Sequence, residues 1–460
     1  MKYSEFLKLK QKKDIPTGHD PEFLNSRLFD YQRDITRWAI RRGRAAIFAD
    51  CGLGKTACQV EWALNVHNKT GGNVLILAPL AVSRQTKNEA LTLLGTHVNI
   101  CASQDDVTTG LNITNYEKLH NFDTDEFVGV VLDESSIIKH HTSKTRDELL
   151  QRFSTTPYRL ACTATPSPND YMELGNHSEF LGVMSRSEML SMFFIHDGGS
   201  TSKWRLKGHA QDRFWKWLCS WAVMIRRPSD LGYSDDGFIL PEITVHNHVV
   251  ESDARQNGML FAMPAKTLSE RRQARRGSMT DRVKIAADLA NNSSEPWVIW
   301  CDLNTESEML SKSIKDSIEV KGSDTAQHKE NAMLGFAGGT YRVIVSKPSI
   351  AGFGLNWQHC NNMAFVGLSD SFEAYYQATR RCWRFGQKKP VNVHVITSEL
   401  EGAVVKNIQR KEKDAENMSE SMVRHMSHIS SSEIKGVKKD KTEYMPQENI
   451  HLPPFLREAV

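Results

Sequence analysis

The stretch Ile47–Thr56, IFADCGLGKT, decides the fold, because an apolar run passes there through a glycine-containing turn into a helical pattern. This strand–turn–helix order is the context that a phosphate-binding loop of the Walker A type requires. Gly52 and Gly54 allow backbone N–H groups to approach phosphate oxygens, and the start of the following helix adds partial positive charge. We expect Lys55 to reach the β- and γ-phosphates of a nucleotide and the Thr56 hydroxyl to bind Mg²⁺. Alone, the motif indicates an NTPase and nothing narrower.

A second strand pattern supplies the acidic group that such a loop needs. Val128–Leu132, VGVVL, is a continuous apolar run that ends directly before Asp133 and Glu134. At the tip of a buried strand, Asp133 would hold Mg²⁺ together with Thr56, and Glu134 would be the general base that orients the attacking water. An Asp-Glu pair at a strand end is often only solvated, but the loop upstream favours the catalytic interpretation.

Short apolar runs alternate with helical patterns around these motifs, and the alternation returns in the second half of the chain. Continuous apolar runs suit strands that are buried on both faces of a parallel sheet. The sequence therefore predicts an α/β protein with two domains, each a parallel sheet flanked by helices. The predicted organisation is an N-terminal extension (1–23), a first lobe (24–185), an interlobe helical insertion and hinge (186–239), a second lobe (240–411) and a polar tail (412–460).

The composition excludes several other classes of protein. Of the 460 residues, 40% are hydrophobic and 25% are charged, which is ordinary globular usage rather than that of a disordered or fibrous chain. No window approaches the roughly 20 apolar residues of a membrane-spanning helix, so we expect no membrane partner. The eight cysteines are scattered without a C-x2-C pair, which argues against a disulfide scaffold or a zinc site and favours a reducing cytosol. The net charge of +3 is too small to indicate a nucleic-acid partner by itself.

Further stretches of the first half resemble motifs of helicase superfamily 2, and specifically of its Swi/Snf-type DNA translocases. Leu28–Gln32, LFDYQ, resembles the leading element of the family, in which Gln32 would read adenine. Asp133–Lys139, DESSIIK, resembles motif II, with Ser136 where the family usually has His or Gln. The resemblance also implies residues that face DNA or couple the ATP site to it: Pro79 in motif Ia (Leu77–Leu80), Asn115 in motif Ib (Ile113–Glu117), and Thr163 and Thr165 in motif III (Thr163–Pro166).

The most specific match lies in the second half. Gln377–Val391, QATRRCWRFGQKKPV, resembles the motif VI signature of the same family. It implies that Arg381 and Arg384 act as arginine fingers and that Gln377 takes part in coupling to DNA. Three residues apart on a predicted helix, both arginines could point into one cleft. A solvated basic helix face is the plain alternative, and the register of Gln377 and Gly386 argues against it.

Two stretches depart from the expected patterns. Ala49 occupies the first position of G-x4-G-K-[ST]. Ala351–Asn356, AGFGLN, resembles motif V but is one residue shorter than the Gly-Gly form, and Gly354 in it would bring the backbone close to phosphate. The resemblance covers residues 24–410 or so, and long insertions and accessory domains are missing from it. A compact bacterial or phage-encoded member is therefore expected.

The resemblance implies two RecA-like P-loop NTPase lobes with the ATP site in the cleft between them. The cofactors would be ATP and Mg²⁺. The first lobe would hold the nucleotide and the second would supply the arginines, so that hydrolysis requires cleft closure. Closure and reopening would move the protein along the backbone of double-stranded DNA without sequence specificity. The expected location is cytoplasmic, in a bacterium or an infected host cell, and no protein partner is indicated.

Two basic stretches raise the question of direct contact with nucleic acid. Lys203–Lys207 and Arg213–Trp217 interleave basic and aromatic residues, which is typical of stacking surfaces for nucleic acids. We favour core packing for the tryptophans at 215, 217 and 221, since tryptophans are usually buried. Arg271–Arg276 suits a solvent-facing helix end and a backbone contact about equally well.

Three alternative functions remain open from the sequence. The first is a helicase for RNA or single strands, which the motif VI signature disfavours. The second is the motor subunit of a restriction or defence system, which would need a nuclease elsewhere, since no nuclease constellation is recognisable here. The third is a DNA-binding scaffold with a degenerate motor, which the intact set of Lys55, Asp133, Glu134 and Arg384 disfavours.

Overall fold

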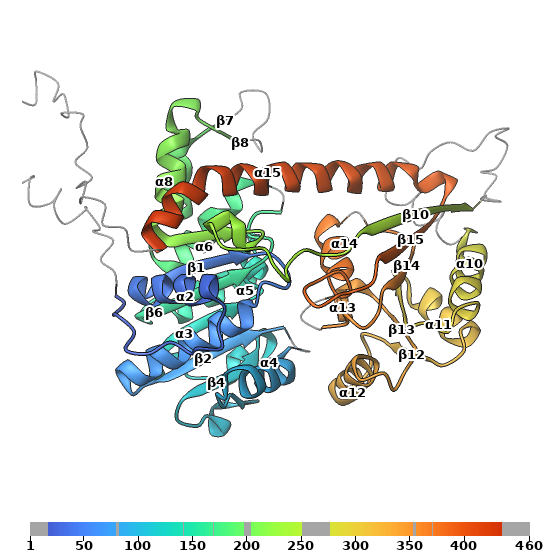
Figure 1. Ribbon diagram of the computed structural model, residues 1–460, viewed down its shortest axis with the longest axis horizontal. Helices are drawn as coiled ribbons and strands as arrows, with labels where there is room; N and C mark the ends of the chain where they lie inside the picture. The colour runs from blue at the N-terminus through green and yellow to red at the C-terminus, as the bar shows by residue number, and fades with distance from the viewer. Residues whose placement is uncertain are drawn as a thin grey trace, which may run out of the picture.

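The computed structural model describes residues 17–79, 82–140, 142–168, 170–196, 204–250, 277–352, 356–369 and 371–434. These residues form two α/β lobes that lie side by side, with one long helix running across both of them (Figure 1). The prediction of two lobes, each a parallel sheet flanked by helices, is confirmed.

Lobe 1 is built on a seven-stranded sheet with the order β3-β4-β2-β5-β6-β1-β9, and every pairing in it is parallel. Successive residues of a strand point to opposite faces, so Ile47 packs into one hydrophobic cluster and Phe48 into another. Both faces are therefore covered, as the continuous apolar runs require. The strands are β1 (Arg44–Ala49), β2 (Asn73–Ala78), β3 (Asn99–Ile100), β4 (Leu111–Asn115), β5 (Phe127–Asp133), β6 (Tyr158–Thr163) and β9 (Ala222–Ile225).

The helices of lobe 1 divide between the two faces of the sheet. The first two along the chain pack into the cluster that contains Ile47, and the last four contribute to the cluster that contains Phe48. Helix α4 is flanked by Val82 and Ala90, which belong to the Ile47 cluster. The helices are α2 (Asp30–Arg42), α3 (Lys55–Thr70), α4 (Ser83–Glu89), α5 (Lys144–Arg152), α6 (Leu174–Leu181), α7 (Arg186–Phe193) and α8 (Gln211–Trp221).

Lobe 2 repeats this plan with a six-stranded parallel sheet in the order β10-β15-β14-β11-β13-β12. Two hydrophobic clusters again cover its faces. The strands are β10 (Ile243–Val250), β11 (Trp297–Cys301), β12 (Ser317–Val320), β13 (Val343–Ser346), β14 (Asn362–Val366) and β15 (Val391–Ser398), and the helices are α10 (Met279–Asn291), α11 (Asn304–Ser313), α12 (Ala326–Ala337), α13 (Pro348–Ala351) and α14 (Phe372–Thr379).

The segment 186–239, predicted as a helical insertion between the lobes, belongs structurally to lobe 1. Its four-residue strand β9 pairs with β1 and is buried throughout, and α8 packs against the same lobe. Trp215 and Trp221 lie in the core and Trp217 packs against it, as the core interpretation predicts. The segment also carries a short hairpin of β7 (Phe194–His196) and β8 (Trp204–Leu206).

Helix α15 (Gly402–Ile434) crosses from lobe 2 to lobe 1 (Figure 1). Val404 and Ile408 pack into the core of lobe 2, whereas Met422 and Met426 pack into that of lobe 1. The boundary predicted at residue 411 is therefore not present, and residues 412–434 are part of a helix with a buried face rather than a polar tail. Residues 435–460, like 1–16 of the N-terminal extension, lie outside the described residues.

The structure also bears on two expectations from the composition, which concern membrane-spanning helices and the cysteines. Among the described residues, no helix combines the length and apolar character needed to cross a membrane. All eight cysteines are buried free thiols.

Candidate functional site

The phosphate-binding loop joins the end of β1 to the start of α3, and its two glycines are required by its conformation. Gly52 and Gly54 have φ values of 89° and 74°, in the left-handed region that glycine adopts without strain. A Cβ on Gly54 would lie 2.2 Å from Gln32 Nε2, and one on Gly52 would lie 2.7 Å from the backbone nitrogen of Phe385 in lobe 2. The loop is therefore in close contact both with the leading element and with the motif VI segment.

Lys55 is the first residue of α3, and its side chain folds back over the loop. Its Nζ donates to the carbonyl oxygens of Ala49 at 2.8 Å and Asp50 at 3.3 Å. The ammonium group is thus held above the loop, where phosphate oxygens of a nucleotide would compete for it.

Two buried carboxylates lie at the end of β5: Asp133 is its last residue and Glu134 follows it. Asp133 Oδ1 accepts hydrogen bonds from Gln59 Nε2 on α3 at 2.8 Å and from the Glu134 N–H at 3.1 Å. The Tyr116 hydroxyl donates to the Asp133 carbonyl at 2.7 Å, which fixes the end of the strand. Burial and the neighbouring Glu134 raise the pKa of Asp133. A divalent cation between these groups would favour the ionised carboxylate, so the donor set suits Mg²⁺.

A chain of polar contacts leads from Glu134 to lobe 2. The Thr163 hydroxyl donates to Glu134 Oε2 at 3.3 Å, and the Thr165 N–H donates to the Thr163 hydroxyl at 3.1 Å. The Thr165 hydroxyl donates in turn to Glu373 Oε1 of α14 at 3.5 Å, and Glu373 also forms an ion pair with Lys139. The two threonines therefore lie between the candidate general base and the opposite lobe.

The two motif VI arginines lie beyond the end of α14 rather than on a helix, so that part of the prediction is wrong. Helix α14 ends at Thr379, and the chain turns there, with the Arg381 carbonyl accepting the Trp357 N–H at 3.0 Å. Gln377 is fully buried, and its side-chain oxygen accepts Arg381 Nη2 at 3.1 Å, so in the structure it positions an arginine and does not face a surface. Burial, with a smaller contribution from Arg381, lowers the pKa of Arg384 to about 10, which leaves its guanidinium charged at neutral pH.

A cavity of about 740 Å³ lies between the lobes, and its volume falls in the range of small-molecule sites. Most of the predicted nucleotide-site residues line it: Gln32, Gly52, Gly54, Lys55, Thr56, Asp133, Glu134, Arg381 and Arg384. Gly354, also predicted to contact the nucleotide, lies outside the described residues.

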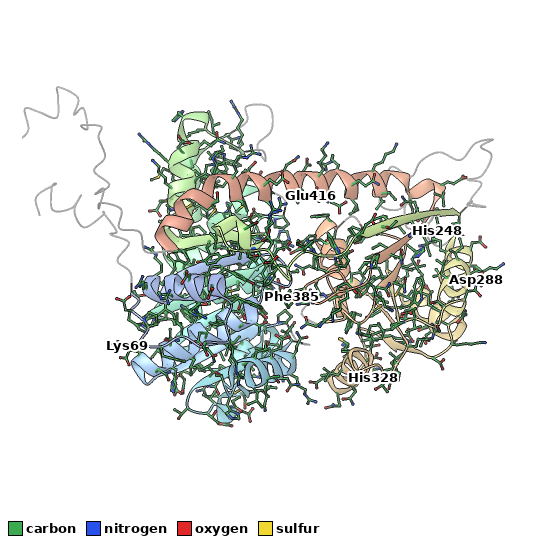
Figure 2. The ribbon with its side chains drawn as sticks, viewed as in Figure 1. Lys69, His248, Asp288, His328, Phe385 and Glu416 are labelled. Atoms are coloured by element: carbon green, nitrogen blue, oxygen red, sulfur yellow. The ribbon has the colours of Figure 1, made fainter. Side chains whose placement is uncertain are left out.

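Three phenylalanines at this cavity were not singled out from the sequence. Phe29 precedes α2, Phe238 lies between β9 and β10, and Phe385 follows Arg384. The ring centroids of Phe238 and Phe385 are 4.8 Å apart, and those of Phe29 and Phe238 are 5.1 Å apart. Phe385 lies where the two lobes meet (Figure 2). Only their convergence in space distinguishes them from other aromatic residues, so no local signal could have found them.

A second interlobe cavity, of about 730 Å³, lies beside the first and shares Glu134 with it. The predicted DNA-facing residues Pro79 and Asn115 line it from lobe 1, and Lys329 and Ser349 line it from lobe 2. Neither Thr163 nor Thr165 is among the residues that line this cavity.

The basic-aromatic stretch around β8 is occupied by contacts within lobe 1. Trp204 packs against His196, with ring centroids 4.5 Å apart. Lys207 Nζ donates to the carbonyls of Ser191 at 2.8 Å and Met192 at 3.3 Å, at the end of α7. Lys203 and residues 271–276 lie outside the described residues.

Two family models match the chain, one in each lobe. Residues 25–168 match the model of the type III restriction enzyme, res subunit, and residues 281–386 match that of the helicase conserved C-terminal domain. One similar solved structure is the SWI2/SNF2 ATPase core of Sulfolobus solfataricus in complex with dsDNA, with 17% sequence identity and a TM-score of 0.42 over 90% of this chain and 98% of that chain. No curated protein matches the sequence.

Proposed function

This chain is a helicase-type ATPase of superfamily 2, and we propose that it couples the hydrolysis of ATP to movement along duplex DNA. The observation that carries the proposal is the cavity of about 740 Å³, which is lined by the phosphate-binding loop and acidic pair of lobe 1 and by two arginines of lobe 2. A nucleotide there would contact both RecA-like lobes at once, so its binding and hydrolysis would change how the lobes sit against each other.

The residues of lobe 1 would bind the nucleotide and activate the water. Lys55 and the loop would hold the β- and γ-phosphates, with Thr56 and Asp133 at Mg²⁺, which supplies positive charge at the transferred phosphoryl group. Glu134 would accept the proton of the attacking water. Gln32 already uses its amide N–H groups on the Leu53 carbonyl and the Tyr31 hydroxyl, and its side-chain oxygen accepts the Phe29 N–H at 3.1 Å. The second lone pair of that oxygen would accept a hydrogen bond from adenine.

The residues of lobe 2 would complete the site. Arg381 and Arg384 would stabilise the negative charge that develops on the transferred phosphoryl group. The contacts from Glu134 through Thr163 and Thr165 to Glu373 offer a route by which the state of the nucleotide reaches the second cavity.

The second cavity is the proposed path of the nucleic acid. Pro79 and Asn115 lie on its lobe 1 side and Lys329 lies on its lobe 2 side, so opening and closing would shift one set of backbone contacts against the other. Among nucleic acids we favour duplex DNA, bound through its backbone without sequence specificity, because Gln377–Val391 resembles the motif VI of duplex translocases. We also propose a cytosolic location, which the eight free thiols support.

The match of residues 25–168 favours one second candidate. The chain would then be the motor of a restriction or defence system and would act with a nuclease on a separate subunit. The ATP site and the nucleic-acid path would be the same in both cases.

Steady-state ATPase activity tests the proposal. At one fixed salt concentration, activity is measured without nucleic acid and with duplex DNA, single-stranded DNA or RNA, because phosphate contacts depend strongly on salt. We expect duplex DNA to stimulate hydrolysis most, and Lys55→Ala to remove the activity under every condition. Stimulation by RNA or single strands alone would instead indicate a strand-separating helicase, and an inactive wild type would leave only the scaffold.

A further inference from the structure

Asp50 is held in the phosphate-binding loop by three hydrogen bonds, which involve its N–H, its carboxylate and its carbonyl. Its N–H donates to the Ile225 carbonyl at the end of β9 at 3.0 Å, and its carboxylate accepts the Cys51 N–H at 2.6 Å. Its carbonyl accepts the Lys55 ammonium group at 3.3 Å. A shift of the Asp50 side chain would therefore also shift the loop backbone and the carbonyl that accepts Lys55.

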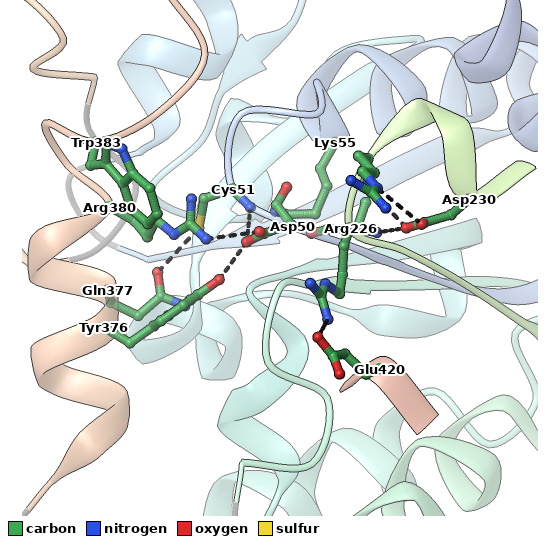
Figure 3. Close-up of polar contacts among 12 residues, drawn as sticks. Asp50, Cys51, Lys55, Arg226, Asp230, Tyr376, Gln377, Arg380, Trp383 and Glu420 are labelled. Atoms are coloured by element: carbon green, nitrogen blue, oxygen red, sulfur yellow. Dashed lines mark hydrogen bonds and ion pairs between the residues drawn. The ribbon is translucent and has the colours of Figure 1, made fainter. Parts of the chain in front are cut away.

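Two side chains of lobe 2 hold that carboxylate (Figure 3). Arg380 Nη2 donates to Asp50 Oδ2 at 2.9 Å, and the Tyr376 hydroxyl donates to Asp50 Oδ1. The guanidinium group lies 4.3 Å from the ring centroid of Trp383, whose Nε1 donates to the Pro241 carbonyl at 2.7 Å. Only 11% of the Arg380 side chain and 18% of the Asp50 side chain are exposed, so the ion pair is largely shielded from water.

Arg380 differs from the two arginines that follow it in what it faces. Arg381 and Arg384 line the nucleotide cavity, whereas Arg380 and Asp50 line a separate cavity of about 530 Å³ between the lobes. Arg380 would therefore not touch the nucleotide. It is nevertheless directly bonded to Arg381 along the chain and ion-paired to the loop that would hold the phosphates.

We propose that Arg380 is a positioning residue. Its ion pair with Asp50 fixes the position of the Arg381–Arg384 segment relative to the phosphate-binding loop. The inference rests on the proposed ATPase function of this site. The arginines would be correctly placed for phosphoryl transfer only while the Asp50–Arg380 contact between the lobes is made.

The phosphate-binding loop packs closely against the segment that contains Phe385, so the relative position of the two segments matters. A Cβ on Gly52 would lie 2.7 Å from the Phe385 backbone nitrogen, so the two segments already approach as closely as glycine permits. Buried ion pairs contribute little net stability, which favours a role in geometry over one in folding. A displacement of the order of 1 Å at reacting groups can cost about 100-fold in rate.

A double-mutant cycle of Arg380→Met and Asp50→Asn tests the proposal. We expect each single variant to lower kcat for ATP hydrolysis by about 100-fold, while the affinity for a non-hydrolysable ATP analogue stays near that of the wild type. The double variant should be no worse than the more damaged single variant, and Arg380→Lys should recover part of kcat. Arg410→Met, which breaks an exposed ion pair with Asp414 on α15, is the matched control and should match the wild type.

The double variant also guards against a folding artefact, because it leaves no unpaired buried charge. Three results would each overturn the positioning role. The first is a double variant whose loss of kcat is the product of the two single losses. The others are a loss of analogue affinity as large as the loss of kcat, and an unchanged kcat in Arg380→Met. A wild type without ATPase activity in any condition would instead overturn the proposed function, and the inference with it.

Discussion

Arg384→Ala is expected to lower kcat for ATP hydrolysis by about 10³–10⁵-fold, the range that arginine fingers supply elsewhere. Arg384 comes from lobe 2 and lines the cavity opposite the phosphate-binding loop. Its contribution would be made to charge that develops only during phosphoryl transfer, so ATP binding should change far less than kcat. Both quantities can be followed, with steady-state hydrolysis for kcat and equilibrium binding of a non-hydrolysable analogue for affinity.

The control for this prediction is Arg410→Ala, on an exposed part of α15 away from the cavity. The role assigned to Arg384 would have to be given up if its removal weakened analogue binding and left kcat unchanged. That pattern would describe an arginine that only holds the ground state of the nucleotide.

Glu134→Gln is expected to lower kcat by about 10²–10⁴-fold, the contribution typical of a general base. The amide has the shape of the carboxylate and can still accept the Thr163 hydroxyl, which lies 3.3 Å from Glu134 Oε2. It cannot accept a proton from water, so nucleotide binding should persist while kcat falls. Two measurements would show that the chemical step is impaired and binding is not. Product formation should be slow and show no initial burst, and the affinity for a non-hydrolysable ATP analogue should stay near normal.

Glu126→Gln is the matched control, because Glu126 is an exposed glutamate of lobe 1 whose carboxylate accepts Gln104 Nε2 at 2.7 Å. Its activity should equal that of the wild type. Hydrolysis by Glu134→Gln at the wild-type rate would rule out Glu134 as the base.

The parts of the site that the sequence predicts best are those carried by contiguous motifs. A strand, a glycine turn and a helix follow one another in Ile47–Thr56, so local geometry alone brings Lys55 over the loop. Asp133 ends β5 and Glu134 follows it, and parallel strands end at the same edge of a sheet, which places the acids beside the loop.

The parts that the sequence does not reveal depend on contacts between distant segments. Strand β9 has four buried residues, and a run this short cannot be recognised from the sequence as an edge strand beside β1. Met422 and Met426 belong to a stretch rich in polar residues, and lobe 1 is what gives them a buried face. The Asp50–Arg380 pair joins residues 330 positions apart, and neither belongs to the consensus positions of its motif.

The arginine segment shows how a correct assignment can rest on a wrong local structure. A spacing of three predicts that Arg381 and Arg384 share one face of a helix, but α14 ends at Thr379. The two side chains still reach one cavity, because the turn after the helix packs against Gly52 and its neighbours.

The most direct test of the central claim, that this two-lobed ATPase moves along duplex DNA, is displacement of a third strand from a DNA triplex. Movement along the duplex strips the third strand without separating the other two. The account predicts ATP-dependent displacement by the wild type and none by Lys55→Ala or Glu134→Gln at equal DNA binding. Duplex-stimulated hydrolysis without any displacement, or displacement that continues in Lys55→Ala, would contradict it.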